Sequence, residues 1–309
     1  MRSKDFSCVR VSELVINWHV LEACNYRCRY CFAKWEKPAH PELWRSSENS
    51  ERLLEALWDF FDPANSENPL RRSMEWKRLR LSLAGGEPTL LGTRLIDIAR
   101  KAHQLGFSVS LISNGSRLDP EWVQELAPLL SVIGLSLDAV DPATNLAIGR
   151  DYRGECLDID RIVSIVDTAR RVNPAIEIKI NTVVNEANTD TDMSALITVV
   201  RPDRWKVMRM LPMVTQALAI DDASFASFIN RHGVHSDVMC VEDNGDMTQS
   251  YVMVDPHGRF FQNNIAGAPY IYSPEILLAG AGAAFERIPF SPPKFAGRYA
   301  IATGGETAE

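Results

Sequence analysis

The sequence predicts an α/β fold, in which parallel strands build a barrel or half-barrel and a C-terminal extension with a short hairpin follows. Two observations support this prediction. Extended apolar runs alternate with longer amphipathic runs, which is the pattern of parallel βαβ units. Several of the expected strands also combine one apolar face with one polar or cationic face, whereas parallel strands buried on both sides are apolar throughout.

Strands and helices alternate as far as about Gly233. The expected strands span residues 14–18, 79–84, 108–113, 132–136, 176–184 and 205–210, and the expected helices span 50–61, 94–105, 120–129, 159–172, 192–199 and 221–232. Beyond this point, short strands at 251–254 and 259–262 predict a hairpin that turns near residues 256–258. We therefore expect a barrel over residues 1–232 and an extension over 233–309 that closes the site. The small, polar tail after about residue 302 is expected to be disordered.

Four of the expected strands place polar or cationic side chains on one face, because residues two apart in a strand share a face. The pairs are Asn17 and His19, Arg80 and Ser82, Lys179 and Asn181, and Arg204 and Lys206. An exposed sheet edge would show the same alternation, but its presence in four strands favours a lumen that holds a charged ligand. Arg80 could instead reach solvent from its strand. The two lysines could pair with carboxylates such as Asp138 or Glu87.

The charge balance is acidic, with 33 Lys and Arg against 40 Asp and Glu and a net charge of −7. This argues against nucleic acid as a partner, because such partners usually meet a basic surface. No apolar run is long enough to span a bilayer, and the first residues lack the apolar stretch and cleavage site of a secretory signal. We therefore expect a cytoplasmic protein that does not engage a membrane.

Three of the six cysteines, Cys24, Cys28 and Cys31, form a C-x3-C-x2-C motif directly after the first strand. In a reducing compartment, such a group of thiols indicates metal binding rather than disulfides. Thiolates suit zinc or an iron–sulfur cluster. A structural zinc site would need a fourth ligand, for which His19 and His40 are the nearest histidines, although His19 fits a core or supporting role better. A 4Fe–4S cluster held by three cysteines instead leaves one iron open.

This loop, with Tyr30 before its last cysteine, resembles the radical S-adenosylmethionine (SAM) superfamily, whose fold is a partial (β/α)6 barrel. Later segments follow successive strands in the order of that superfamily. The stretch Gly85-Gly86-Glu87-Pro88 resembles the segment that contacts the methionine amine. Ser113-Asn114-Gly115 resembles a loop on the cofactor side, and Ser136 lies near the expected ribose and carboxylate contacts. The resemblance implies a 4Fe–4S cluster, with SAM consumed as a co-substrate.

The remaining motifs resemble one family of this superfamily, the viperins, and specifically their prokaryotic members. The resemblance runs from about Val15 to Gln262 and includes NWHVLEACNYRCRYCF, LAGGEPTLL, NLAIGR, KINTVVNEANTDTDM, RWKVMRML and SYVMVDPHGRFFQN. The pieces KINTVVN and RWKV discriminate best, because general radical SAM chemistry does not need them. Viperins convert a ribonucleoside triphosphate to its 3′-deoxy-3′,4′-didehydro form, which terminates chains made by viral polymerases.

The family's mechanism implies that the reduced cluster cleaves SAM to methionine and a 5′-deoxyadenosyl radical, which takes the hydrogen from C4′ of the ribose. Loss of the 3′-hydroxyl, with a further electron and a proton, leaves the 3′,4′ alkene. The protein must exclude water and position C4′. We assign no catalytic residue beyond those that hold the cluster and SAM. The mechanism also implies an electron donor such as a flavodoxin or ferredoxin.

The resemblance assigns two groups of contact residues. The expected SAM contacts are Tyr30, Gly85, Gly86, Glu87, Ser113, Asn114, Ser136 and Arg150. The expected nucleotide contacts are Asn17, Arg80, Lys179, Asn181, Arg204, Lys206 and Tyr251. The second group agrees with the strand faces, because buried cations need anionic partners and a triphosphate supplies them.

Some alternatives stay open at this point. Another radical SAM enzyme could act on a peptide or a small metabolite, although only Cys240 lies beyond Cys156, whereas peptide-modifying members often carry a cysteine-rich C-terminal extension. A zinc or iron–sulfur protein that senses redox state would need neither the GGEP segment nor the cationic strands. The chain begins almost directly at the barrel, so we do not expect the membrane-associating helix of animal viperins. CTP, UTP and GTP are all candidate substrates.

Overall fold

The computed structural model describes residues 8–264 and 268–299 of the chain, and its strands form one sheet. The strands are β1 (Val9–His19), β2 (Met74–Ala84), β3 (Ser108–Ser113), β4 (Val132–Ser136), β5 (Glu177–Val184), β6 (Arg204–Arg209), β7 (Met239–Glu242), β8 (Val252–Val254), β9 (Arg259–Asn263) and β10 (Tyr270–Glu275). Their order across the sheet is β10-β9-β8-β1-β2-β3-β4-β5-β6-β7. Neighbours from β8 to β7 in this order are parallel, and β9 is antiparallel to both β8 and β10.

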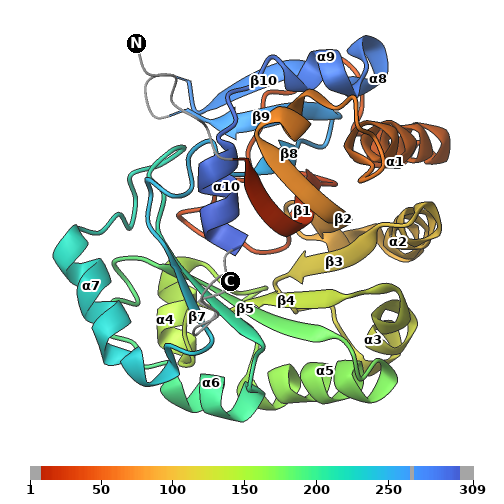
Figure 1. Ribbon diagram of the computed structural model, residues 1–309. Helices are drawn as coiled ribbons and strands as arrows, with labels where there is room; N and C mark the ends of the chain where they lie inside the picture. The colour runs from red at the N-terminus through yellow and green to blue at the C-terminus, as the bar shows by residue number, and fades with distance from the viewer. Residues whose placement is uncertain (1–7, 265–267, 300–309) are drawn as a thin grey trace, which may run out of the picture.

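Helices connect the parallel strands, and most of them lie along the outer side of the curved sheet, whereas the last described helix lies against β1 (Figure 1). They are α1 (Ser47–Phe61), α2 (Thr93–Leu105), α3 (Pro120–Leu126), α4 (Pro142–Ile148), α5 (Ile159–Val172), α6 (Ser194–Val200) and α7 (Asp222–Arg231), followed later by α8 (Ile276–Ala279), α9 (Ala281–Phe285) and α10 (Pro292–Tyr299). Four of them begin after an aspartate whose carboxylate accepts a hydrogen bond from the helix backbone: Asp119, Asp141, Asp158 and Asp221. Over the described residues, no helix combines the length and the apolar character needed to cross a membrane.

The parallel α/β half-barrel and the hairpin are confirmed, and the structure adds elements that the sequence did not predict. The first two strands begin earlier than expected, because Val9 and Met74 already pair in register. The prediction that the alternation ends near Gly233 is wrong, since β7 continues the parallel sheet beside β6. With only four residues, MCVE, it is too short to stand out as a strand in the sequence. The predicted disordered tail lies outside the described residues.

The core lies between the outer face of the sheet and the surrounding helices. The apolar residues of the strand alternation, among them Trp18, Leu81, Ile180 and Trp205, are fully buried there. The alternate residues face the concave side, where parallel register aligns Lys179 with Arg204 and Asn181 with Lys206. The small side chains of Ser82 and Ser110 line the cavity on this side. The apolar residues of the alternation therefore pack against the helices on the outer face of the sheet, and the polar residues line a cavity on its inner face.

The β1–β2 pairing continues beyond the strand ends into the loop that leads to the first cysteine. Gly86 N–H donates to the Leu21 carbonyl at 2.7 Å, and Glu87 N–H donates to the Ala23 carbonyl at 2.9 Å. A Cβ on Gly86 would lie 2.1 Å from the Ala23 carbonyl oxygen, so any larger residue must push the two loops apart. Gly85 has φ of +146°, which L side chains rarely adopt.

We predict that Gly86→Ala destabilises the protein by about 1–3 kcal/mol, because its Cβ overlaps rigid backbone. Gly245→Ala is the control, since a Cβ there meets nothing within 4 Å, and its effect should stay within about 0.5 kcal/mol. Urea unfolding of both variants measures the difference. Equal stability of the two variants would show that the loops are not held in this close contact.

Candidate active site

The three cysteines of the motif line one end of a cavity of about 320 Å³ on the concave side of the sheet. All three are free and partly exposed. The loop that carries them is held by hydrogen bonds from Arg27 N–H to the Gly149 carbonyl and from Arg29 N–H to the Ile148 carbonyl. Among the described residues, no three His, Cys, Asp or Glu side chains lie close enough together to hold a single metal ion.

The fit of an iron–sulfur cluster rests on the chemistry of these donors. Arg150 Nη1 lies 3.7 Å from Cys28 Sγ, and Asn114 Nδ2 lies 3.8 Å from Cys24 Sγ. Such donors to sulfur are among the features that tune iron–sulfur clusters. Burial raises the pKa of Cys28 to about 12, so the free thiol is protonated and ligation to iron would release its proton. Three thiols on one loop, facing a cavity, fit the predicted cluster.

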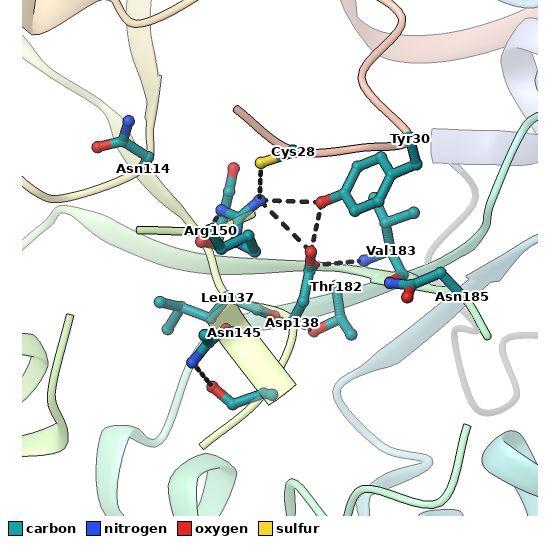
Figure 2. A network of polar contacts seen from close by, with 12 residues as sticks. Cys28, Tyr30, Asn114, Leu137, Asp138, Asn145, Arg150, Thr182, Val183 and Asn185 are labelled. Carbon is teal, nitrogen blue, oxygen red and sulfur yellow. Dashed lines mark hydrogen bonds and ion pairs between the residues drawn. The ribbon is translucent and has the colours of Figure 1, made fainter. Parts of the chain in front are cut away.

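Beside the cysteines lies a buried ionic network centred on Asp138, which is 1 % exposed. Arg150 Nη1 lies 3.4 Å from Asp138 Oδ2 and donates to the Tyr30 hydroxyl at 2.9 Å. The Tyr30 hydroxyl donates to the same carboxylate, and Val183 N–H donates to the other oxygen at 2.9 Å. Figure 2 shows the guanidinium of Arg150 reaching Cys28, Tyr30 and Asp138. The network therefore joins the cysteine loop to the ends of β4 and β5.

Arg150 also donates to the backbone carbonyl of Ser136, which places both residues at the same wall of the cavity. The sequence resemblance paired these two residues, and the structure brings them together. The alternative that a lysine pairs with Asp138 is wrong, because Asp138 pairs with Arg150 and lies at the cysteine end of the cavity. Lys206 does pair with a carboxylate, which is that of Glu242.

Glu87 links the GGEP and SNG segments. Its buried carboxylate accepts hydrogen bonds from Ser113 Oγ at 2.7 Å, from Asn114 N–H at 2.7 Å and from Thr89 Oγ1 at 2.6 Å. The proposal that it could pair with a lysine is therefore wrong. Asn114 continues the chain of contacts, donating to Asn25 Oδ1 at 3.0 Å in the cysteine loop. These bonds hold together the segments that were predicted to contact SAM.

The other end of the cavity is cationic. Lys179, Arg204, Lys206 and Arg80 all line it, as the strand faces predicted. Arg80 pairs with Glu13 at 3.2 Å and is only partly exposed, so it does not extend into solvent. Lys179 has no hydrogen bond or ion pair with any described residue, and burial, with Arg204 and Arg80 nearby, lowers its pKa to about 7. An anion at this end would stabilise the charged form of Lys179.

Two residues that sequence reasoning missed complete this end. Glu242, at the end of β7, lies 2.7 Å from Lys206 Nζ and 3.0 Å from Arg298 Nε. Burial alone would raise the pKa of Glu242, but Lys206 and Arg298 hold it well below its usual range. The Tyr251 hydroxyl donates to Glu242 at 2.6 Å and accepts from Lys206 at 2.8 Å. The sequence around Glu242 does not indicate that it faces the cavity, because β7 is too short for its side-chain alternation to be seen. The sequence around Arg298 does not indicate that this residue reaches Glu242.

The β1 residues Asn17 and His19 line the cavity between its two ends. Asn17 Nδ2 donates to the Val252 carbonyl at 3.3 Å, while Asn181 lies across the cavity on β5. His19 is buried against Phe32, Trp35 and Phe261, and burial lowers its pKa to about 3. Its Nδ1 has no hydrogen-bond partner among the described residues. The imidazole is therefore neutral and retains hydrogen-bonding capacity toward the cavity.

The chain matches the sequence model of the radical SAM superfamily over residues 18–199, which is more than half of its length. The fold agrees, since native anSMEcpe with bound AdoMet superimposes with a TM-score of 0.62 at 15% identity, covering 95% of this chain and 84% of that one. Streptococcus suis SuiB bound to S-adenosylmethionine gives a TM-score of 0.59 at 13% identity, covering 93% and 68%. At these identities the likeness concerns the fold alone.

Sequence relatives narrow the assignment. An S-adenosylmethionine-dependent nucleotide dehydratase of Pseudoalteromonas ulvae is 40% identical over 94% of this chain and 94% of its own length. The dehydratase of Psychrobacter lutiphocae is 38% identical over 93% and 95%. The dehydratase RSAD2 of Oncorhynchus mykiss is 30% identical over 79% of this chain and 68% of its own. The protein is a radical SAM enzyme, and within that superfamily it belongs to the family of SAM-dependent nucleotide dehydratases.

We predict that Asp138→Ala costs about 3–5 kcal/mol of stability, because it leaves Arg150 buried without its carboxylate. The control is Asp97→Ala, which removes an exposed carboxylate 3.2 Å from Arg100 and should cost at most about 1 kcal/mol. Denaturant unfolding of both variants provides the comparison. A loss for Asp138→Ala no larger than that of the control would contradict a buried ionic network at this position.

Proposed function

We propose that the protein converts a ribonucleoside triphosphate, with CTP, UTP and GTP as candidates, to its 3′-deoxy-3′,4′-didehydro analogue. The product would act as a chain terminator against phage polymerases. The observation that supports this most is one cavity that joins three cysteines at one end to a group of cations at the other. This arrangement suits a reaction that brings a radical source and a polyanionic substrate together.

At the cysteine end, Cys24, Cys28 and Cys31 hold the 4Fe–4S cluster in this proposal. When bound, the cluster and SAM supply the 5′-deoxyadenosyl radical that removes the C4′ hydrogen. The SAM contacts are Tyr30, Gly85, Gly86, Glu87, Ser113, Asn114, Ser136 and Arg150. The hydrogen bonds among Glu87, Ser113 and Asn114 support this group, because they hold the surrounding loops in fixed positions. Arg150 and Asp138 fix Tyr30 beside them.

At the cationic end, Lys179, Arg204 and Lys206 bind the triphosphate. Guanidinium groups match phosphate oxygens, and the ammonium of Lys179, which has no ion pair among the described residues, gains a partner when the anion arrives. Arg80 lies at the same end and keeps Glu13 as its partner. Asn17 on β1 and Asn181 on β5 both line the cavity and have donors and acceptors for ribose hydroxyls or phosphate. Tyr251 contributes its hydroxyl beside Lys206.

The C-terminal segment closes the substrate site in this proposal, with residues 1–232 as the barrel and 233–309 as an extension that also adds β7 to the parallel sheet. Tyr251 and Arg298 support this, since both join Glu242 and Lys206 at the cationic end. Closure matters because water must be excluded from a radical reaction. We place the protein in the cytoplasm, where its thiols stay reduced, with an electron donor such as a flavodoxin or ferredoxin and without a nucleic-acid or membrane partner.

The test is an anaerobic assay of cluster-loaded, dithionite-reduced enzyme with SAM and each of CTP, UTP, GTP and ATP. We expect 5′-deoxyadenosine to rise with one nucleotide, together with a new triphosphate lighter by one water, both detected by mass spectrometry. Slow and equal 5′-deoxyadenosine formation with every nucleotide would contradict this substrate. It would favour a radical SAM reaction on a peptide or a small metabolite instead.

The pKa of Lys179 predicts how nucleotide affinity depends on pH. The free lysine is protonated below about pH 7 and neutral above it. A bound triphosphate requires the charged form, so affinity should fall as pH rises from about 7.5 to 9, with a limiting slope near tenfold per unit. Lys179→Gln should bind more weakly at pH 7 and lose this slope, whereas Lys101→Gln on α2 should retain it. Calorimetric titration with CTP measures both variants, and an unchanged slope in Lys179→Gln would contradict this role.

A further inference from the structure

Each cysteine of the motif has its own neighbours. Cys24 Sγ lies 3.8 Å from Asn114 Nδ2, in the SNG segment, and Cys28 Sγ lies 3.7 Å from Arg150 Nη1, which follows α4. Cys31 packs against a different set of buried side chains, which we call the aromatic group: Ala33, Trp35, Met253, Phe261 and Tyr270. Three members of this group lie on β8, β9 and β10. The C-terminal part of the chain therefore supports the third cysteine.

Tyr270, on β10, adds a hydrogen bond to this packing. Its buried hydroxyl donates to the carbonyl of Phe32, the residue directly after Cys31. The tyrosine ring lies edge-on to Phe261, with 5.3 Å between the ring centroids, so its position is restricted. Burial, with Tyr272 and Cys31 nearby, raises the pKa of Tyr270, so the hydroxyl remains a donor. This bond ties the backbone beside the third cysteine to β10.

The strand pair β9–β10 also binds the chain further along. Glu36 N–H donates to the Tyr272 hydroxyl at 3.1 Å, and the Glu36 carbonyl accepts from Arg259 Nη2 at 2.7 Å. His40 Nε2 lies 2.7 Å from Glu275 Oε1. These contacts hold the segment that leaves the cysteine loop, but they begin at Glu36. The hydroxyl bond from β10 to Phe32 differs from them because it acts directly beside a cysteine.

This bond can be removed without disturbing the surrounding structure. The Phe32 carbonyl also accepts from Lys34 N–H at 2.7 Å, so it keeps a partner when the tyrosine hydroxyl is absent. A change of Tyr270 to phenylalanine preserves the ring that packs against Phe261. Since no buried polar group is left without a partner, the change should cost little overall stability. Its effect should fall on the placement of the adjoining loop.

We propose that Tyr270 is a positioning residue for the iron–sulfur centre, because its hydroxyl fixes the backbone at Phe32 and thereby the direction of Cys31 Sγ. Cys24 and Cys28 are held by segments of the barrel, whereas Cys31 depends on β10. The C-terminal extension therefore serves the cysteine end of the cavity as well as the cationic end. This inference goes beyond the proposed function, since it requires the three-cysteine centre and no particular substrate.

Alkylation of the metal-free protein tests the position of Cys31. Trypsin cleaves after Arg27 and Arg29, so Cys24 and Cys31 lie on separate peptides and mass spectrometry follows their reactions with iodoacetamide separately. In Tyr270→Phe we expect Cys31 to react about three- to tenfold faster than in the wild type, which is the effect of losing one buried hydrogen bond. The Cys24 rate should equal the wild-type rate.

Tyr272→Phe is the matched control. It lies on the same strand and also removes one hydroxyl and one hydrogen bond, but its partner is Glu36, further along the chain. Its Cys31 rate should equal that of the wild type. Urea unfolding measures the stability of both variants. A general loss of stability exposes Cys24 and Cys31 alike, so the ratio of their rates reports the position of Cys31 and does not respond to overall stability.

A second readout uses the cluster-loaded protein without SAM or nucleotide. Residues that orient a metal ligand typically affect metal affinity about tenfold or more. We therefore expect Tyr270→Phe to lose iron to a chelator about tenfold faster than the wild type. The electron paramagnetic resonance spectrum of its dithionite-reduced centre should also shift, because the direction of one thiolate ligand changes. Tyr272→Phe should match the wild type in both measurements.

The proposal would be overturned by an unchanged Cys31 rate in Tyr270→Phe, by an equal rise at Cys24, or by an equal rise in Tyr272→Phe. Unchanged iron loss and an unchanged spectrum in Tyr270→Phe would also overturn it, because the hydrogen bond would then not influence the bound centre. None of these readouts uses a nucleotide. A negative result in the nucleotide assay would therefore contradict the proposed function alone.

Discussion

The parallel pairing of β1 with β2 is the constraint on which the rest of the site depends. It does not stop at the strand ends, because Gly86 and Glu87 continue it along Leu21 and Ala23. This continuation fixes the start of the cysteine loop, and Glu87 then fixes the next loop through Ser113 and Asn114. Each loop is positioned by its contacts with a neighbouring loop. The register of β1 against β2 therefore determines where the cysteines lie. Two glycines permit this, since larger residues would clash with backbone.

The same register organises the opposite end of the cavity. Lys179 lies beside Arg204 and Asn181 beside Lys206, so the cations form adjacent rows rather than scattered charges. Repulsion among them is offset by Glu242, which contacts Lys206 and Arg298. One carboxylate shared by two cations leaves the pocket positive while limiting the cost of burying the charges. Lys179, which lacks such a partner among the described residues, is the position where an anion gains most.

The local parts of this structure could be predicted from the sequence, and the parts that depend on long-range contacts could not. Strand periodicity identified the pocket-facing residues from Asn17 to Lys206, because the two-residue repeat is a property of each strand alone. The C-x3-C-x2-C spacing similarly marks one loop. The ion pairs of Asp138, Glu242 and Arg298 were not predicted, because only folding brings each carboxylate to its partner. Glu242 meets an arginine 56 residues away, and nothing near it in the sequence indicates this. β7 was not predicted for the same reason, since so short a strand is stable only when it pairs with β6.

The location of Arg298 has a consequence for how the protein is made. The cysteines leave the ribosome long before Arg298, which lies on the last described helix and completes the cationic end. Arg204 donates to the carbonyl of Arg298, and Arg298 reaches back to Ser250 at 2.9 Å. These contacts join distant parts of the chain, which makes this end of the cavity a late product of folding. The nascent chain therefore presents its cysteines while the cavity is still open, and the cationic end is complete only after Arg298 has been synthesised and packed.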